Sequence, residues 1–164
     1  MQLVLGNFLI KLMSKEKGPV APFIILFVLS IQFLVAKYLL FLELKVQVNL
    51  WLISCLILFG LLIIFLSFIE FRRYKTTFIP FKKSKTLITE KIFGYSRNPM
   101  YLGMLFFLIG MGFISNNIGS IFTAYLFVPI MNNRVIQHEE KMLSEEFCDD
   151  YILYKSNVKK WIGW

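Results

Sequence analysis

Two long apolar runs limit what this chain can fold into more than any other feature. They cover residues 22–42 and 48–69, and a membrane-spanning helix needs about 20 apolar residues. Only a short polar turn separates them. Across the whole chain 57% of the residues are hydrophobic, which exceeds the share in a typical soluble domain. We therefore expect an all-α integral membrane protein.

Two shorter apolar segments follow, at residues 99–114 and 118–131, with a polar turn between them. This pattern predicts a helical hairpin, and it brings the expected number of transmembrane helices to about four. Pro99 suits the first turn of the third helix, where a backbone N–H is not needed.

The positive charges fix the expected orientation. With four spans, the N-terminal segment, residues 70–98 and residues 134–164 share one side, and this side holds 16 of the 18 Lys and Arg residues. The positive-inside rule makes that side cytoplasmic. We therefore expect a multi-pass protein of a plasma membrane, such as the bacterial inner membrane, with both termini cytoplasmic. The same asymmetry explains the net charge of +8 without a nucleic-acid partner.

The remaining segments complete one membrane domain, residues 1–164. Residues 1–18 have the apolar spacing of an amphipathic helix on the cytoplasmic surface. Residues 134–164 form an expected cytoplasmic tail that folds back and closes the site. Its helix carries a stripe at every fourth position, formed by Glu139, Leu143, Phe147 and Tyr151.

The metal-binding residue types are scarce. Cys55 lies in an apolar run and Cys148 in an acidic stretch, so a disulfide framework is not expected. His138 is the one histidine, which leaves little room for a zinc site, and we expect no metal.

The first candidate site is the segment 94–103, at the mouth of the third helix. A helix N-terminus favours an anion, and Gly103 would let a ligand approach the backbone. Arg97 is the expected catalytic side chain, because its planar guanidinium can pair with an anionic part of cofactor or substrate at the pocket mouth. The alternative is a plain loop-to-helix junction, with Arg97 on a lipid phosphate and Tyr101 in an interfacial belt.

The second candidate site is the pair Glu139 and Glu140. A carboxylate on the apolar stripe could bind an ammonium group or ribose hydroxyls, whereas the alternative is a solvated acidic face. Both candidate sites are expected on the cytoplasmic side, so one pocket can use both.

These two segments resemble the signatures of the isoprenylcysteine carboxyl methyltransferase and phospholipid methyltransferase families. Residues 86–103 resemble the first family motif, and residues 139–158 resemble the second. The resemblance implies an integral membrane enzyme that uses S-adenosyl-L-methionine, held by these two motifs and not by a Rossmann domain.

The resemblance also implies roles for single residues. Leu87 and Ile88 would line the adenosine side, while Asn98, Pro99 and Tyr101 would line the methionine end. Glu139 would hold a polar group of the cofactor. The full expected cofactor-binding set is Leu87, Ile88, Phe93, Asn98, Pro99, Tyr101, Gly103, Glu139 and Glu140.

The chain departs from the family pattern at three positions. Asn98 replaces a common histidine, and Lys91 stands where glycine is usual. Val135 stands where prenylcysteine enzymes have an arginine that contacts substrate, which weakens the case for a carboxylate acceptor.

The expected reaction is methyl transfer from a sulfonium to a lipophilic or membrane-associated acceptor. The protein mainly positions and desolvates the reactants in such a transfer. A prenylcysteine-like carboxylate, a phospholipid amine, an isoprenoid and a thiol all remain open as acceptor, and the expected partners are this acceptor and the lipid bilayer. Two alternatives are an NADPH-dependent reductase of the sterol-reductase type and a small non-enzymatic membrane subunit.

Overall fold

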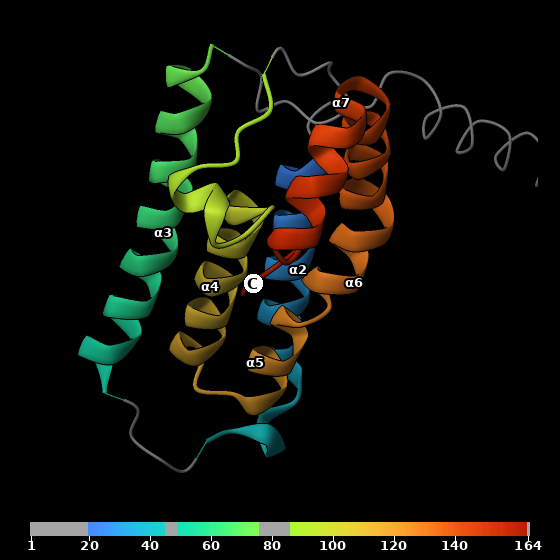
Figure 1. Cartoon of the computed structure of the whole chain (residues 1–164). Coiled ribbons are helices and arrows are strands. Elements are labelled where there is room, and N and C mark those ends of the chain that lie inside the picture. Colours follow the sequence, from blue (N-terminus) through green and yellow to red (C-terminus); the bar gives the residue numbers. More distant parts are fainter. Residues whose placement is uncertain (1–19, 45–48, 76–85, 164) are drawn as a thin grey trace, which may run out of the picture.

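The computed structural model describes residues 20–44, 49–75 and 86–163, and within them the chain is helical. A single isolated bridge, between Glu43 and Asn117, is the extended pairing in that part of the chain. The helix expected at residues 1–18 lies outside the described residues. Figure 1 shows α3, α4, α2 and α6 standing side by side, with α7 packed at one end.

The elements follow one another with short connections. They are α2 (Val20–Tyr38), the 3-10 turn η1 (Leu40–Leu42), α3 (Leu50–Arg73), the 3-10 turn η2 (Lys91–Gly94), α4 (Pro99–Ile114), α5 (Ile118–Ala124), α6 (Phe127–Met131), the π-helical turn η3 (Asn132–Ile136) and α7 (Gln137–Asn157).

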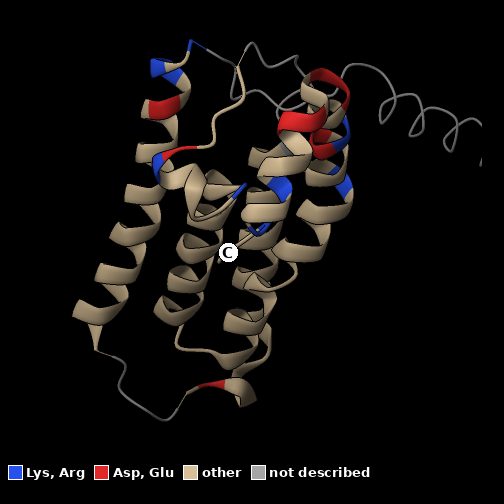
Figure 2. Cartoon of the chain, in the orientation of Figure 1, with Lys and Arg blue, Asp and Glu red and all other residues tan. Residues whose placement is uncertain are grey.

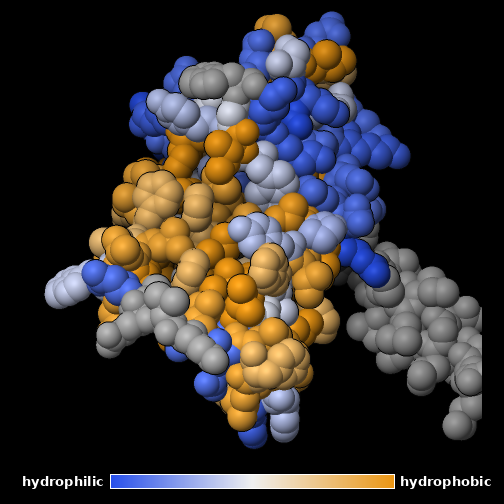
Figure 3. Space-filling model, turned by 90° about the horizontal axis from the view of Figure 1, so that it is seen from below, coloured by the Kyte–Doolittle hydropathy of each residue, from blue (hydrophilic) through white to orange (hydrophobic). Residues whose placement is uncertain are grey.

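Two helices are long and apolar enough to cross a membrane, Ala21–Tyr38 and Leu50–Arg73. Large apolar side chains point outward from both, with Phe23 68% and Trp51 81% exposed, as expected of surfaces that face lipid. Hydrophobic side chains cover much of the face seen in Figure 3. Most of the charged residues drawn in Figure 2 gather at the end of the bundle where α7 lies. This is a membrane protein by the character of its helices.

The first two helices differ from the expected runs at their ends. The first ends at Tyr38 and not at residue 42, because the chain turns through η1. The second continues to Arg73, four residues into the expected loop. Glu70 lies within this extension and is only 5% exposed. The Nζ of Lys91 lies 2.9 Å from its Oε1, which allows the carboxylate to be buried in the helix.

The expected hairpin is only partly as predicted. Its first arm, α4, spans the expected residues, but the second arm is broken at Tyr125 and Leu126 into α5 and α6. This second arm then runs through η3 directly into α7, so no loop separates it from the tail. The α7 backbone is itself interrupted at Cys148, whose φ is 43°. The expected stripe is therefore continuous only up to Phe147.

Close contact between two glycines packs α3 against α4. A Cβ on Gly103 would lie 2.6 Å from the carbonyl oxygen of Gly60, and a Cβ on Gly60 would lie 2.7 Å from that of Gly103. Small residues allow such an approach between helices in a membrane. This contact sets the depth at which the first turn of α4, and with it the candidate site, lies along α3.

A buried glutamine connects α2 to the hairpin. The Nε2 of Gln32 donates to the carbonyl oxygens of Leu108 (2.9 Å) and Ser120 (3.0 Å). The hydroxyl of Ser120 donates back to the Gln32 carbonyl at 3.0 Å. Such polar contacts between apolar helices hold the bundle together where lipid offers no hydrogen-bond partner.

Candidate active site

The end of the chain is fastened to the loop that precedes α4. The backbone N–H of Arg97 donates to the carbonyl of Lys159 at 3.0 Å, and that of Gly163 donates to Tyr95 at 3.2 Å. The side chain of Asn98 adds a third bond, from Nδ2 to the carbonyl of Lys160 at 3.0 Å. Three bonds over so few residues fix residues 159–163 against the first candidate segment.

An ion pair joins the two candidate segments. The Nη2 of Arg97 lies 2.9 Å from Oε1 of Glu140, and the two side chains are 7% and 13% exposed. The Nη1 of Arg97 donates to the carbonyl of Lys155 at 3.2 Å. Its Nε is buried without a hydrogen-bond partner. The guanidinium is therefore held within the protein, with one donor still unused.

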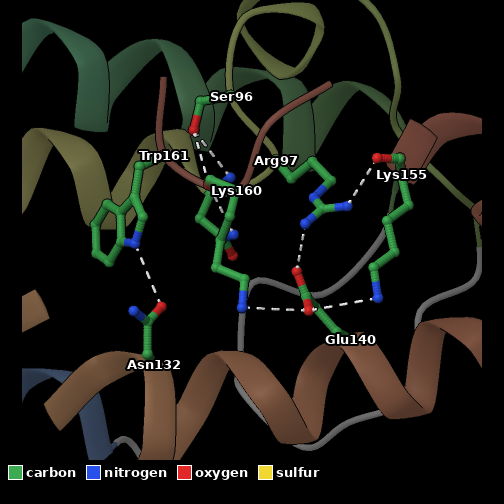
Figure 4. A network of polar contacts seen from close by, with 8 residues as sticks. Ser96, Arg97, Asn132, Glu140, Lys155, Lys160 and Trp161 are labelled. Atoms are coloured by element: carbon green, nitrogen blue, oxygen red, sulfur yellow. Dashed lines mark hydrogen bonds and ion pairs between the residues drawn. The ribbon is translucent and has the colours of Figure 1, made fainter. Parts of the chain in front are cut away.

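Two lysines complete the surroundings of Glu140. The Nζ of Lys160 lies 3.5 Å from Oε2 of Glu140, and that of Lys155 lies 4.0 Å from the same atom. Figure 4 shows Arg97, Lys155 and Lys160 all directed toward this one carboxylate. The local charge is therefore positive.

A second contact between the segments involves Tyr101 and Glu139. The Tyr101 hydroxyl donates to Oε1 of Glu139 at 2.9 Å. Burial raises the pKa of the Glu139 carboxyl to about 7; the hydrogen bond from Tyr101 lowers it in part, and the nearby Glu140 raises it. Glu139 thus exchanges its proton near neutral pH, and perturbed groups of this kind are frequent at functional sites.

An aromatic and aliphatic cluster lies next to these polar groups. Tyr151 and Tyr154 are buried with Val158, and Leu87 packs against them. The Tyr154 hydroxyl donates to the carbonyl of Phe93 at 2.6 Å. Burial raises the pKa of both tyrosines above its ordinary value, so they stay neutral and act as donors.

The structure brings most of the expected residues to one region, but in different ways. Arg97, Tyr101, Glu139 and Glu140 are directly bonded to one another in pairs. The others lie in or beside the loop that carries the first motif. Ile88 and Phe93 are buried, Leu87 packs on the tyrosine cluster, Asn98 bonds to the chain end and Pro99 opens α4.

Gly103 requires a correction. Its Cβ side faces the Gly60 carbonyl and Ile64 of α3, so its lack of a side chain serves helix packing. The expected approach of a ligand to this position was wrong, because α3 fills that space.

The expectations for Arg97 and Glu140 are also corrected. Arg97 was expected to have a charge free to reach the pocket mouth, but the guanidinium is buried and paired. Glu140 lies off the expected stripe, yet it is the centre of the charged cluster. The reason is that the turn of helix at 139–140 faces the 97–101 segment with both carboxylates.

Lys91 occupies a position where the family resemblance expects glycine. Its φ is 53°, in the left-handed region that glycine adopts without steric cost. The chain thus keeps the glycine-like turn with a lysine, and the ion pair of that lysine with Glu70 offsets part of the cost.

Some residues of the region were missed in the sequence. Lys155 and Lys160 carry no motif signal, since lysines near the end of a basic chain look like solvated residues. Trp161 was expected in a membrane belt, but it is half-buried and its Nε1 donates to Oδ1 of Asn132 at 3.3 Å. A tail that alternates lysine with apolar residues was the one available hint.

A comparison with family models agrees with this arrangement. The model described as phospholipid methyltransferase matches residues 48–150, from the start of α3 into α7, and so it includes both bonded segments. No curated protein matches the chain. The chain belongs to the phospholipid methyltransferase family, a family of methyltransferase enzymes.

Proposed function

We propose that the protein transfers a methyl group from S-adenosylmethionine to a lipophilic acceptor at the membrane surface. One observation carries the proposal: two polar pairs, Tyr101–Glu139 and Arg97–Glu140, join the two segments within the family match. Side chains that are far apart in the sequence and buried together suit a binding site better than two separate surfaces do.

The chemistry of the side chains suits this cofactor. Glu139 and Glu140 are suited to its ammonium group and ribose hydroxyls, and Arg97 to its carboxylate. The apolar side chains of Leu87 and Ile88 are suited to its adenosine. These residues come from both segments, so binding would require the tail to stay in place.

The reaction asks little of the protein beyond positioning. Bound S-adenosylmethionine would supply an activated methyl group, and its sulfur would leave as a neutral thioether. The buried surroundings of Glu139 would exclude water from the reactants. An amine acceptor would also have to lose a proton, and a carboxyl group whose pKa is about 7 can accept one at neutral pH.

The membrane arrangement is part of the proposal. Four spans, with both termini cytoplasmic, would place both site segments on the side that carries most of the lysine and arginine. Labelling of single cysteines at Asn116 and Lys82, in a chain without Cys55 and Cys148, tests this. The two positions should react from opposite sides of the membrane, and reaction of both from one side would refute the topology.

Cofactor binding tests the function directly. The purified protein should bind S-adenosylhomocysteine, and a nicotinamide dinucleotide should bind at least a hundredfold more weakly. The Glu139→Gln variant should weaken binding by about 1.5–3 kcal/mol, because a charged hydrogen-bond partner is lost. Preference for the nicotinamide dinucleotide would support the reductase alternative, and binding of neither compound would support a non-enzymatic subunit.

A further inference from the structure

The charged cluster around Glu140 holds more cations than its carboxylates balance. In the described part of the chain, the ion pairs of Arg97, Lys155 and Lys160 all go to Glu140. The neighbouring Glu139 is occupied by the Tyr101 hydroxyl. One carboxylate for three cations leaves a surplus of positive charge that an anion would balance.

A second observation also indicates a missing acceptor. The Arg97 side chain is only 7% exposed, and its Nε is buried without a hydrogen-bond partner. A buried donor without a partner costs free energy, so the cluster is short of acceptors as well as of negative charge.

Lys160 belongs to the fixed part of this cluster and is not a loose surface residue. Its carbonyl accepts bonds from the side chains of Ser96 (3.4 Å) and Asn98 (3.0 Å). Its own side chain is only 28% exposed, whereas that of Lys155 is 51% exposed. One edge of the cluster is therefore fixed and the other is open to an incoming ligand.

The surroundings of the open edge are apolar. Ile152, Leu153 and Ile162 lie on the same stretch of chain as the two lysines, and each is more than 60% exposed. Exposed apolar side chains beside lysines are typical of segments that lie in the headgroup region, where the lysine stems contact acyl chains and the ammonium groups contact phosphate.

We infer that Lys155 and Lys160, backed by Arg97, form a site for the phosphate of a membrane glycerophospholipid. The phosphate would sit at the open edge of the cluster, and the acyl chains would lie along the exposed apolar side chains. This inference goes beyond the proposed methyl transfer, because the site recognises the phosphodiester and not the group that is methylated. Both lysines lie outside the residues that match the family model.

The test compares lipids that differ only in the phosphate. The purified full-length protein in neutral detergent is mixed with equal amounts of dioleoylphosphatidylglycerol and dioleoylglycerol, and the bound lipid is measured by native mass spectrometry. Phosphatidylglycerol has no amine to methylate. The wild type should retain it at least tenfold over the diacylglycerol, and Lys155→Gln/Lys160→Gln should lose this preference.

A matched variant separates the site from general attraction. Lys141→Gln/Lys159→Gln removes the same charge from two exposed lysines of the same tail, and it should keep the preference. Equal loss in both double variants would overturn the site, as would preference retained by Lys155→Gln/Lys160→Gln. Competition by 10 mM inorganic phosphate that abolishes the preference would likewise overturn it, because the ligand would then be free phosphate.

A separate measurement distinguishes this site from the cofactor site. S-adenosylhomocysteine affinity should be the same, within twofold, in the wild type and in Lys155→Gln/Lys160→Gln. A tenfold loss would assign the lysines to the cofactor carboxylate and refute the lipid site. Failure of the wild type to bind S-adenosylhomocysteine, with the lipid preference intact, would refute the proposed function and leave the lipid site standing.

Discussion

Arg97 and Glu140 form an ion pair in which Nη2 and Oε1 are 2.9 Å apart and both side chains are largely buried. The pair links the loop before α4 to the first turn of α7, across 43 positions of sequence. A pair of this kind is costly to break, because the partner that remains is left charged and poorly solvated.

Removing the carboxylate of Glu140 should therefore destabilise the protein. Glu140→Gln leaves Arg97 without its anionic partner, and we expect a loss of about 3–5 kcal/mol. The midpoint of thermal unfolding in detergent measures this. Glu145→Gln is the control, because Glu145 pairs with Lys141 at 3.9 Å with both side chains exposed, and it should have an effect below about 1 kcal/mol. Equal effects of the two variants would show that the Arg97–Glu140 pair contributes little.

Shortening the donor fork of Arg97 should also lower stability. Arg97→Lys keeps the charge, but an ammonium group does not reproduce the planar geometry that reaches both Glu140 and the Lys155 carbonyl. We expect a loss of about 1.5–3 kcal/mol, measured by thermal unfolding. Arg134→Lys, at an exposed position, should unfold like the wild type. An unchanged unfolding midpoint in Arg97→Lys would show that the guanidinium geometry is not needed.

Adding one methyl group at Gly103 should separate α3 from α4. A Cβ there would lie 2.6 Å from the backbone oxygen of Gly60, and backbone does not move aside easily. We expect Gly103→Ala to cost about 1–3 kcal/mol by overpacking. In Gly94→Ala the new Cβ would lie 3.5 Å from the Thr89 carbonyl, an ordinary contact, so this variant should lose less than about 1 kcal/mol. Equal unfolding midpoints for these two variants would contradict the close helix contact.

The Glu139 carboxyl should make stability depend on pH. Its pKa is about 7 in the folded protein, against an ordinary value of 4.5. Between these values the unfolded chain loses the proton while the folded chain keeps it, so stability falls as the pH rises from 4.5 through 7. Glu139→Gln does not titrate, so the stability of this variant relative to the wild type should rise by an amount on the order of 2 kcal/mol between pH 5 and pH 8.

Thermal unfolding of the wild type and Glu139→Gln at both pH values checks this. His138 titrates in the same range and lies next to Glu139, so the comparison is repeated in a His138→Asn background. A constant difference between pH 5 and pH 8 would mean that Glu139 is ionised throughout.

Local sequence was enough to predict the helices that are most regular. The apolar run and Pro99 placed α4 correctly, because an apolar segment in lipid has to satisfy its backbone hydrogen bonds internally. The two motifs also indicated which residues belong together. Lys91 shows how far this reaches: the resemblance expects a glycine-like turn there, and the chain makes that turn with another residue.

Contacts between distant residues decided the rest. Composition alone ends the second span near residue 69, but Lys91 pairs with Glu70 and the helix continues to Arg73. The same holds for Glu140, whose importance depends on Arg97, Lys155 and Lys160. The sequence by itself determined the helical membrane character and the two motifs, since these depend on local polarity and spacing. Only the tertiary structure decided which charges meet, because an ion pair depends on distances between atoms that the order of residues does not specify.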